Sequence, residues 1–278
     1  MPLFNKKSPS DKRPGSGGVI GVGSGSLRLK STNEALRIYS ARGDHDQVLE
    51  LLKGGAKFVP DKDGRTLLHL ACINGHCTIA AALIEYGIDY NMQDKLGYTA
   101  LHRSCLETHV EIVRLLLDAG ADCDKQEFMQ DNTSLHDTAW HGHSACMELL
   151  LQAKANIYIR NKTGATALHL ACQNGHNQCC KLLIQRGCKI DVKDKYDDTP
   201  LHTACRYLRT GVTKLLLSSG ANPNEANKNG DTPLHLTCNF GQRKLTKMLL
   251  ESGANPNLTN KLCCYWWGNM PKRIEQHN

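Results

Sequence analysis

Histidine and cysteine are the residues of this chain that could do chemistry, since imidazole can act as a general base and both groups can bind metals or attack carbonyls. The 278-residue sequence contains 13 of each. Six histidines close a Thr-x-Leu-His tetrad, and successive tetrads are 33, 34, 33, 33 and 33 residues apart. They are His69, His102, His136, His169, His202 and His235. Because the spacing is so regular, we interpret them as structural residues whose rings hydrogen-bond their own threonine and a neighbouring backbone group.

A second set of histidines recurs at another repeat position, and it overlaps the one pattern that resembles a metal site. The set is His76, His109, His143 and His176. His141, His143 and Cys146 form an H-x-H-x-x-C pattern, but His143 belongs to the repeat and no fourth zinc ligand is evident. We therefore predict a noncatalytic protein with no catalytic residue, metal or cofactor. A metal-dependent or thiol enzyme is the alternative.

Five cysteines also share one repeat position. They are Cys72, Cys105, Cys172, Cys205 and Cys238. Equivalent residues on stacked helices lie roughly 8–10 Å apart, which exceeds the ~7 Å Cα limit for a disulfide. We predict small buried residues of a reduced protein, and since the sequence has no signal peptide we expect it to be cytoplasmic.

The elements that position these residues repeat with the same period. In the unit that contains Thr166, the threonine is an N-cap residue, Leu168 and Leu170 face the core, and Gly175 is a left-handed C-cap before a second apolar helix. A period near 33 with this plan resembles ankyrin repeats. The sequence therefore predicts an all-α ankyrin-repeat solenoid of stacked helix-turn-helix units with hairpin-like fingers.

The repeat divides the chain into seven units and two tails. Residues 1–30 are basic and rich in Gly and Ser, which predicts a flexible, disordered tail, and residues 31–60 predict a degenerate N-terminal capping unit. Ankyrin repeats are predicted at 61–93, 94–127, 128–160, 161–193, 194–226 and 227–260. Residues 261–278 form a non-repeat C-terminal tail. Its Cys263–Trp267 stretch leaves three interpretations open: an apolar lid on the last repeat, a palmitoylated tip, or an end left by truncation or alternative splicing.

The formal net charge of +7 resides in the tails. Residues 1–30 carry +5 and residues 261–278 carry +2, so the repeats between them are neutral. A neutral array has little means of binding phosphates through counterion release, so we do not expect a nucleic-acid partner. No apolar run approaches the ~18 residues of a membrane span. We expect a monomer without a transmembrane segment.

Departures from the repeat mark places where its surface changes. Thr108 and Leu208 replace the glycine that ends the first helix, and Lys154 replaces the glycine after the second, where the backbone needs positive φ. The 34-residue spacing adds one residue to the finger formed by residues 126–132. The extra residue is either sequence variation in a surface loop without a functional role or part of a shaped contact site.

The concave face of such an array is lined by the finger tips and the outer positions of each first helix. Aromatic residues and arginine, which concentrate binding energy in interfaces, are frequent at these positions. We predict that the face is a protein-binding groove, with partial burial against adjacent fingers as the alternative. The predicted binding residues are Leu96, Tyr98, Leu106, Met129, Trp140, His141, Tyr196, Arg206, Tyr207 and Phe240.

The central repeats resemble those of diversin and its insect relative Diego. The similar segments are 135–142, 161–174 and 198–207. This resemblance implies a cytoplasmic scaffold in Wnt and planar-cell-polarity signalling, with Dishevelled-type and casein-kinase-I-type partners. That family has a long recruiting region after its repeats, and its absence here favours a short isoform or an incomplete gene model.

Two functions follow as hypotheses. The first is a protein-protein interaction scaffold or adaptor that uses the concave face. The alternative is a cytosolic inhibitor that masks a transcription factor or another signalling protein. Masking a basic localisation segment requires an acidic face, which a neutral array does not favour.

Overall fold

The computed structural model describes residues 32–57 and 59–261, and within these ranges the regular structure is entirely helical. Fourteen α-helices occur in the described residues. They are α1 (Thr32–Arg42), α2 (His45–Lys53), α3 (Leu67–Asn74), α4 (Cys77–Glu85), α5 (Ala100–Leu106), α6 (Val110–Asp118), α7 (Ser134–His141), α8 (Ser144–Gln152), α9 (Ala167–Asn174), α10 (Asn177–Gln185), α11 (Pro200–Arg206), α12 (Thr210–Ser218), α13 (Pro233–Asn239) and α14 (Arg243–Glu251).

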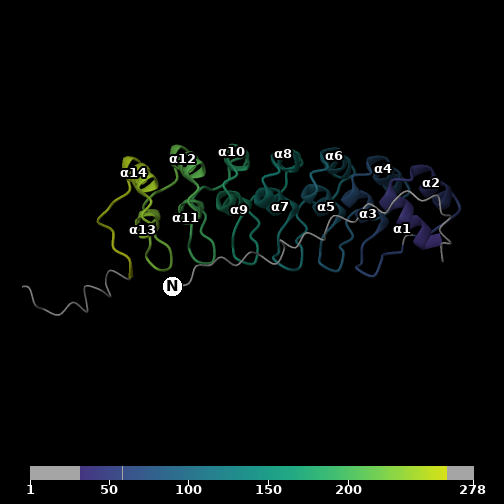
Figure 1. Ribbon diagram of the computed structural model, residues 1–278, viewed down its shortest axis with the longest axis horizontal. Helices are drawn as coiled ribbons and strands as arrows, with labels where there is room; N and C mark the ends of the chain where they lie inside the picture. Colours follow the sequence, from purple (N-terminus) through teal and green to yellow (C-terminus); the bar gives the residue numbers. More distant parts are fainter. Residues whose placement is uncertain (1–31, 58, 262–278) are drawn as a thin grey trace, which may run out of the picture.

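The helices stack as antiparallel pairs into an elongated solenoid (Figure 1). Odd-numbered helices form one row and even-numbered helices a second, and each helix packs on the helix of its own row in the next pair. The connecting loops project as fingers from the side opposite the even-numbered row (Figure 1). The predicted all-α ankyrin-repeat solenoid is confirmed. Each predicted unit holds one helix pair, although the unit boundaries themselves stay a prediction.

Each odd-numbered helix from α3 onward begins directly after the threonine of a tetrad, which is its N-cap residue. Thr166, for example, has extended backbone, and its side chain and His169 form a capping box that satisfies free N–H groups of the first turn. Pro200 and Pro233 occupy the first helical position, where the missing N–H is not needed. The sequence-predicted start of the first helix in these units is therefore confirmed.

The helix ends follow the expected backbone geometry even where glycine is absent. Gly175 ends α9 with φ of 82°. Thr108, Lys154 and Leu208 take φ of 59°, 64° and 58° at the positions where glycine was expected, so the turn is kept and the residues carry the strain.

One apolar core runs through the whole stack. Leucines, isoleucines, alanines and cysteines from successive pairs form a single cluster from Leu36 to Ala254. Cys72, Cys105, Cys172 and Cys205 lie in it as predicted, but Cys238 is exposed. The prediction was wrong for Cys238 because α13 belongs to the last helix pair of the described residues, so no further pair covers it.

Three expectations concern residues outside the described ranges. They are the flexible tail at 1–30, the C-terminal tail beyond Lys261, and the Cys263–Trp267 stretch within it. No helix among residues 32–57 and 59–261 is both long and apolar enough to span a bilayer.

Candidate protein-binding face

The tetrad histidines join each unit to the next. In His169, Nδ1 accepts a hydrogen bond from the Thr166 backbone N–H at 3.2 Å, which leaves Nε2 to donate to the Asp198 carbonyl of the following finger at 3.1 Å. His69, His136 and His202 make the same pair of bonds. Both ring nitrogens are thereby used, so these side chains act as connectors rather than as ligands or bases.

Burial keeps the tetrad rings neutral. It lowers the pKa of His102, His136 and His169 to about 4, although nearby backbone carbonyls oppose the shift. The core thiols are shifted in the other direction, since burial raises the pKa of Cys72 and Cys205 to about 12. A protonated thiol is a poor nucleophile, so Cys72 and Cys205 are poor nucleophiles at neutral pH.

The second set of histidines caps the even-numbered helices and contacts the preceding unit. His176 Nε2 lies 3.0 Å from the Trp140 carbonyl, and its ring covers Gly142, where an added Cβ would approach the ring to 2.5 Å. In the next unit Arg209 replaces the histidine and donates from Nε to the Gln173 carbonyl. These residues are therefore explained by packing between neighbouring units.

The H-x-H-x-x-C pattern does not converge on one point. His141 Nδ1 lies 3.0 Å from the Asp137 carbonyl, and His143 Nδ1 lies 2.9 Å from the Cys105 carbonyl. Cys146 is buried and interacts with the Cys105 thiol. In the part of the chain that the structure describes, no three potential metal ligands form a group.

The fingers are organised by one carboxylate or amide at the start of each turn. Oδ1 of Asp94 accepts hydrogen bonds from the backbone N–H groups of Leu96 and Tyr98. Oδ1 of Asn161 does the same for Thr163 and Ala165. This side chain therefore determines the shape of the finger tip, a form of local capping typical of Asp and Asn.

The finger with the extra residue uses a longer side chain for this purpose. Glu127 accepts bonds from the N–H groups of Met129, Gln130 and Asn132, so its carboxylate spans five residues instead of four. The signal was present in the sequence, because Glu127 stands where the other units have Asp or Asn. The added residue is thus accommodated by a built turn that presents Phe128 and Met129.

Two arginines on this side are held by finger aspartates. Arg206, a predicted binding residue, pairs with Asp198, which also accepts a bond from Asn227 Nδ2. Arg103, which was not predicted, pairs with Asp94 and lies 4.2 Å from the centroid of the Tyr98 ring. Tyr98 is half-buried beneath it, and burial raises the pKa of its hydroxyl to about 12.

The predicted binding residues fall into two rows that these ion pairs bring side by side. Leu96, Met129 and Tyr196 are exposed at finger tips. Leu106, Trp140, His141, Arg206, Tyr207 and Phe240 lie at the ends of odd-numbered helices. Tyr98, Leu106, Trp140 and Arg206 are only partly exposed, and Trp140 packs against the core. We call the two rows together the finger face.

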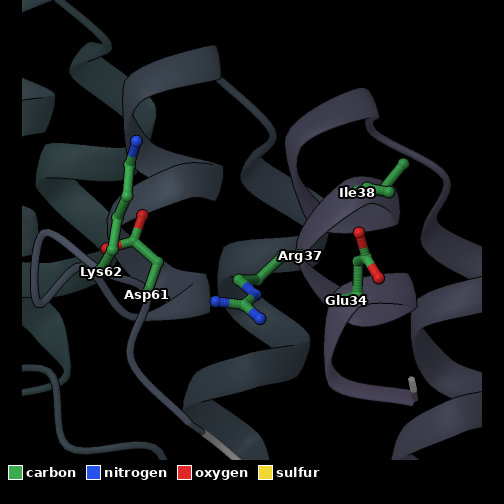
Figure 2. Close-up of a pocket in the computed structure, with 5 residues that line it drawn as sticks. All are labelled: Glu34, Arg37, Ile38, Asp61 and Lys62. Atoms are coloured by element: carbon green, nitrogen blue, oxygen red, sulfur yellow. The ribbon is translucent and has the colours of Figure 1, made fainter. Parts of the chain in front are cut away.

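A pocket of about 550 Å³ lies at the N-terminal end of the described solenoid. Glu34, Arg37 and Ile38 of α1 line it together with Asp61 and Lys62 of the first finger (Figure 2). Asp61 is already hydrogen-bonded by the backbone and guanidinium of Arg65. The pocket therefore extends the finger face by a polar end rather than by an enclosed site.

Comparison with known proteins agrees with this architecture. A family model described as ankyrin repeats (3 copies) matches residues 36–127, 135–227 and 194–260, and a second described as ankyrin repeats (many copies) matches 105–151. The crystal structure of the human ASB11 ankyrin repeat domain is similar, with 30% identity and a TM-score of 0.70 over 80% of this chain and 98% of that one. The ankyrin repeat domain of Bcl-3, described as a unique member of the IkappaB protein family, has 26% identity and a TM-score of 0.71 over 78% and 97%.

Proposed function

The chain belongs to the ankyrin-repeat family, and we propose that it is a noncatalytic scaffold or adaptor that binds a protein partner on the finger face. The observation that carries the proposal is the set of exposed apolar side chains on that face. Tyr196, Met129 and Tyr207 are 63, 61 and 43% exposed, on turns that backbone hydrogen bonds close. Aromatic anchors such as the two tyrosines lose little side-chain entropy on binding.

Substitution of two exposed tyrosines tests this function. We expect Tyr196→Ser with Tyr207→Ser to abolish capture of partners from cell lysate, because each truncation removes an anchor of the kind that contributes ~2 kcal/mol or more. Trp140 is unsuitable, since it packs against the core. The measurement is a pull-down with the full chain, read by quantitative mass spectrometry.

The matched control replaces two tyrosines that are exposed elsewhere. Tyr86 follows α4 and Tyr158 lies in the loop after α8, at 41 and 53% exposure. Tyr86→Ser with Tyr158→Ser should leave capture unchanged, and both double variants should keep the helical circular dichroism. Equal capture by the finger-face variant and the wild type would refute the proposal.

The pathway is a finer proposal that rests on the resemblance to diversin and Diego. We propose cytoplasmic Dishevelled-type and casein-kinase-I-type proteins as the first partners to examine, with the chain as a monomer in a Wnt or planar-cell-polarity assembly. The likeness to Bcl-3 is compatible with the alternative, a cytosolic inhibitor that masks a transcription factor or another signalling protein. Calorimetry with purified candidate partners distinguishes the scaffold function from the inhibitor function.

A further inference from the structure

A row of lysines follows the finger tips of the described solenoid. Each occupies the position after the Asp, Glu or Asn that organises its turn, and all six are exposed. We call the row the lysine ridge: Lys62, Lys95, Lys162, Lys195, Lys228 and Lys261. The neutral repeats thus concentrate positive charge along one edge.

Backbone hydrogen bonds hold the ridge in register. The N–H of Lys95 donates to the Asp63 carbonyl of the preceding finger at 2.9 Å, and the N–H of Lys195 donates to the Thr163 carbonyl at 3.0 Å. Lys162, Lys228 and Lys261 repeat this bond. From Lys95 to Lys261 the row is therefore held by bonds between neighbouring fingers rather than built from independent loops.

Phe128 interrupts the ridge at the finger with the extra residue. It occupies the lysine position and is 54% exposed, and Met129 beside it is the most exposed large apolar residue of the solenoid after Tyr196. The Nζ of Lys162 folds back to the carbonyls of Phe128 and Met129 at 2.5 and 2.8 Å. At the ridge position itself the side chains are therefore positive, then apolar at Phe128, then positive again.

Four lysines of the ridge carry charge that no described carboxylate neutralises. The nearby arginines Arg65, Arg103 and Arg206 are paired with finger aspartates. By contrast, no carboxylate of residues 32–57 and 59–261 lies within ion-pairing distance of Lys62, Lys95, Lys195 or Lys228. Two of these stand on each side of Phe128, so the unneutralised charge flanks the apolar break.

We propose that the finger tips dock an extended segment of a protein partner, with apolar residues on Phe128–Met129 and acidic residues on both sides. The inference rests on the proposed function and specifies its partner. Neighbouring fingers follow the roughly 8–10 Å spacing of the helices, and an extended chain rises about 3.3 Å per residue, so acidic residues should recur about every third position. Charge complementarity then fixes register and partner choice.

Other occupants match the ridge less well. Residues 1–30 carry +5 and a basic localisation segment is also positive, so both are repelled. A nucleic acid or an anionic membrane is uniformly negative and would leave the apolar centre unused. An acidic segment with an apolar centre satisfies both parts of the surface.

A peptide-display selection on the full chain tests the proposal. We expect random 16-residue peptides that bind to be enriched in Asp and Glu at intervals of about three residues around one or two apolar positions. The best peptide should then bind at least tenfold more weakly to Lys62→Glu/Lys95→Glu/Lys195→Glu/Lys228→Glu, and also to Phe128→Ser/Met129→Ser, by fluorescence polarisation.

The matched control reverses the same charge on the opposite side. Lys53, Lys181, Lys214 and Lys244 are exposed on α2, α10, α12 and α14, and their change to Glu should alter affinity less than twofold. Circular dichroism confirms that each variant is folded. Single-stranded poly(U) and phosphatidylserine vesicles are tested in parallel.

Several outcomes would overturn the proposal. They are the absence of any enriched peptide, enrichment of neutral or basic peptides, and affinity that the ridge reversal leaves unchanged. Binding of poly(U) or vesicles through the ridge without peptide binding would assign it to polyanions instead. If peptides lose affinity with Tyr196→Ser and Tyr207→Ser but not with the ridge variants, the proposed function stands and this inference fails.

Discussion

At the scale of single residues, the tetrad histidine is the unit of cohesion. Its Nδ1 closes the cap of its own helix and its Nε2 reaches the next finger, as His202 does with Thr199 and Asp231. The bond to Nδ1 requires the neutral ring, because a protonated Nδ1 could no longer accept, whereas Nε2–H donates in either state. The tetrad histidine is therefore a structural residue that stabilises the stack, although its side chain is of a type that could act in catalysis.

This commitment predicts loss of stability in acid. His102, His136 and His169 have a pKa of about 4 in the folded chain against 6.5 when unfolded, so the unfolded state binds more protons below pH 6.5. Their stabilisation is complete above 6.5 and is lost as pH falls towards 4. At pH 5 each of these histidines should lower the free energy of unfolding by on the order of 2 kcal/mol relative to pH 7.5. Urea unfolding at pH 7.5 and pH 5 measures the difference.

A variant separates this effect from general acid sensitivity. His169→Gln should be less stable than the wild type at pH 7.5 but should lose less between pH 7.5 and 5, because one titrating group is gone. An equal loss in both proteins would contradict the assignment.

At the scale of elements, the finger is shaped by a single side chain at its start. The 34-residue unit has an extra residue that a shorter carboxylate could not span, and Glu127 supplies the missing length with bonds to Met129, Gln130 and Asn132. The insertion therefore produces a defined turn, and the apolar break in the lysine ridge depends on it.

Shortening this side chain should disorder the turn. We expect Glu127→Asp to destabilise the chain by about 1–3 kcal/mol, since three partly buried backbone donors lose their charged acceptor. Glu127→Gln keeps the side-chain length but loses one carboxylate oxygen. Its stability should therefore lie between those of Glu127→Asp and the wild type. Urea unfolding gives the order, and hydrogen exchange over residues 126–133 locates the change. Wild-type stability in Glu127→Asp would be the contrary result.

At the scale of the whole molecule, cohesion is uneven along the stack. Four buried polar atoms without a hydrogen-bond partner among the described residues lie on α5 and α7: His102 Nε2, Arg103 Nε, Ser134 Oγ and Asp137 Oδ2. The Asn132 carbonyl still interacts with the His102 ring, yet the bond seen in four other units does not form. The junction beside the longer finger thus holds more buried polar atoms without a partner than any other junction among the described residues.

Replacing Asp137 should strengthen this junction. Other units carry Leu70, Leu170 or Leu236 there, and burial raises the Asp137 pKa well above its ordinary value. Asp137→Leu should therefore stabilise the chain by about 1–3 kcal/mol at pH 7.5.

The sign of the pH dependence follows from the raised pKa. In the wild type the penalty of ionising Asp137 grows as pH rises from its unfolded pKa to its folded one, so the gain in Asp137→Leu should shrink as pH is lowered. Thermal unfolding of the variant and the wild type at several pH values measures this difference in stability. A destabilised variant at pH 7.5 would show that the carboxylate has a partner role at the junction.

Sequence alone determined the repeat, the caps, the role of most of the histidines and the burial of Cys72, Cys105, Cys172 and Cys205, because these follow from local spacing and backbone geometry. It also marked the position of the altered finger at residues 126–132, and the exposed Leu96, Met129, Tyr196, Tyr207 and Phe240 lie on the face that it indicated.

Only the tertiary structure decided which side chains of that face are available. Trp140 packs on the core, and the lysines become one ridge through bonds between fingers. The reason is physical. Caps and periods depend on residues three to eight apart, whereas availability depends on contacts between units about 33 residues apart, which no local pattern contains.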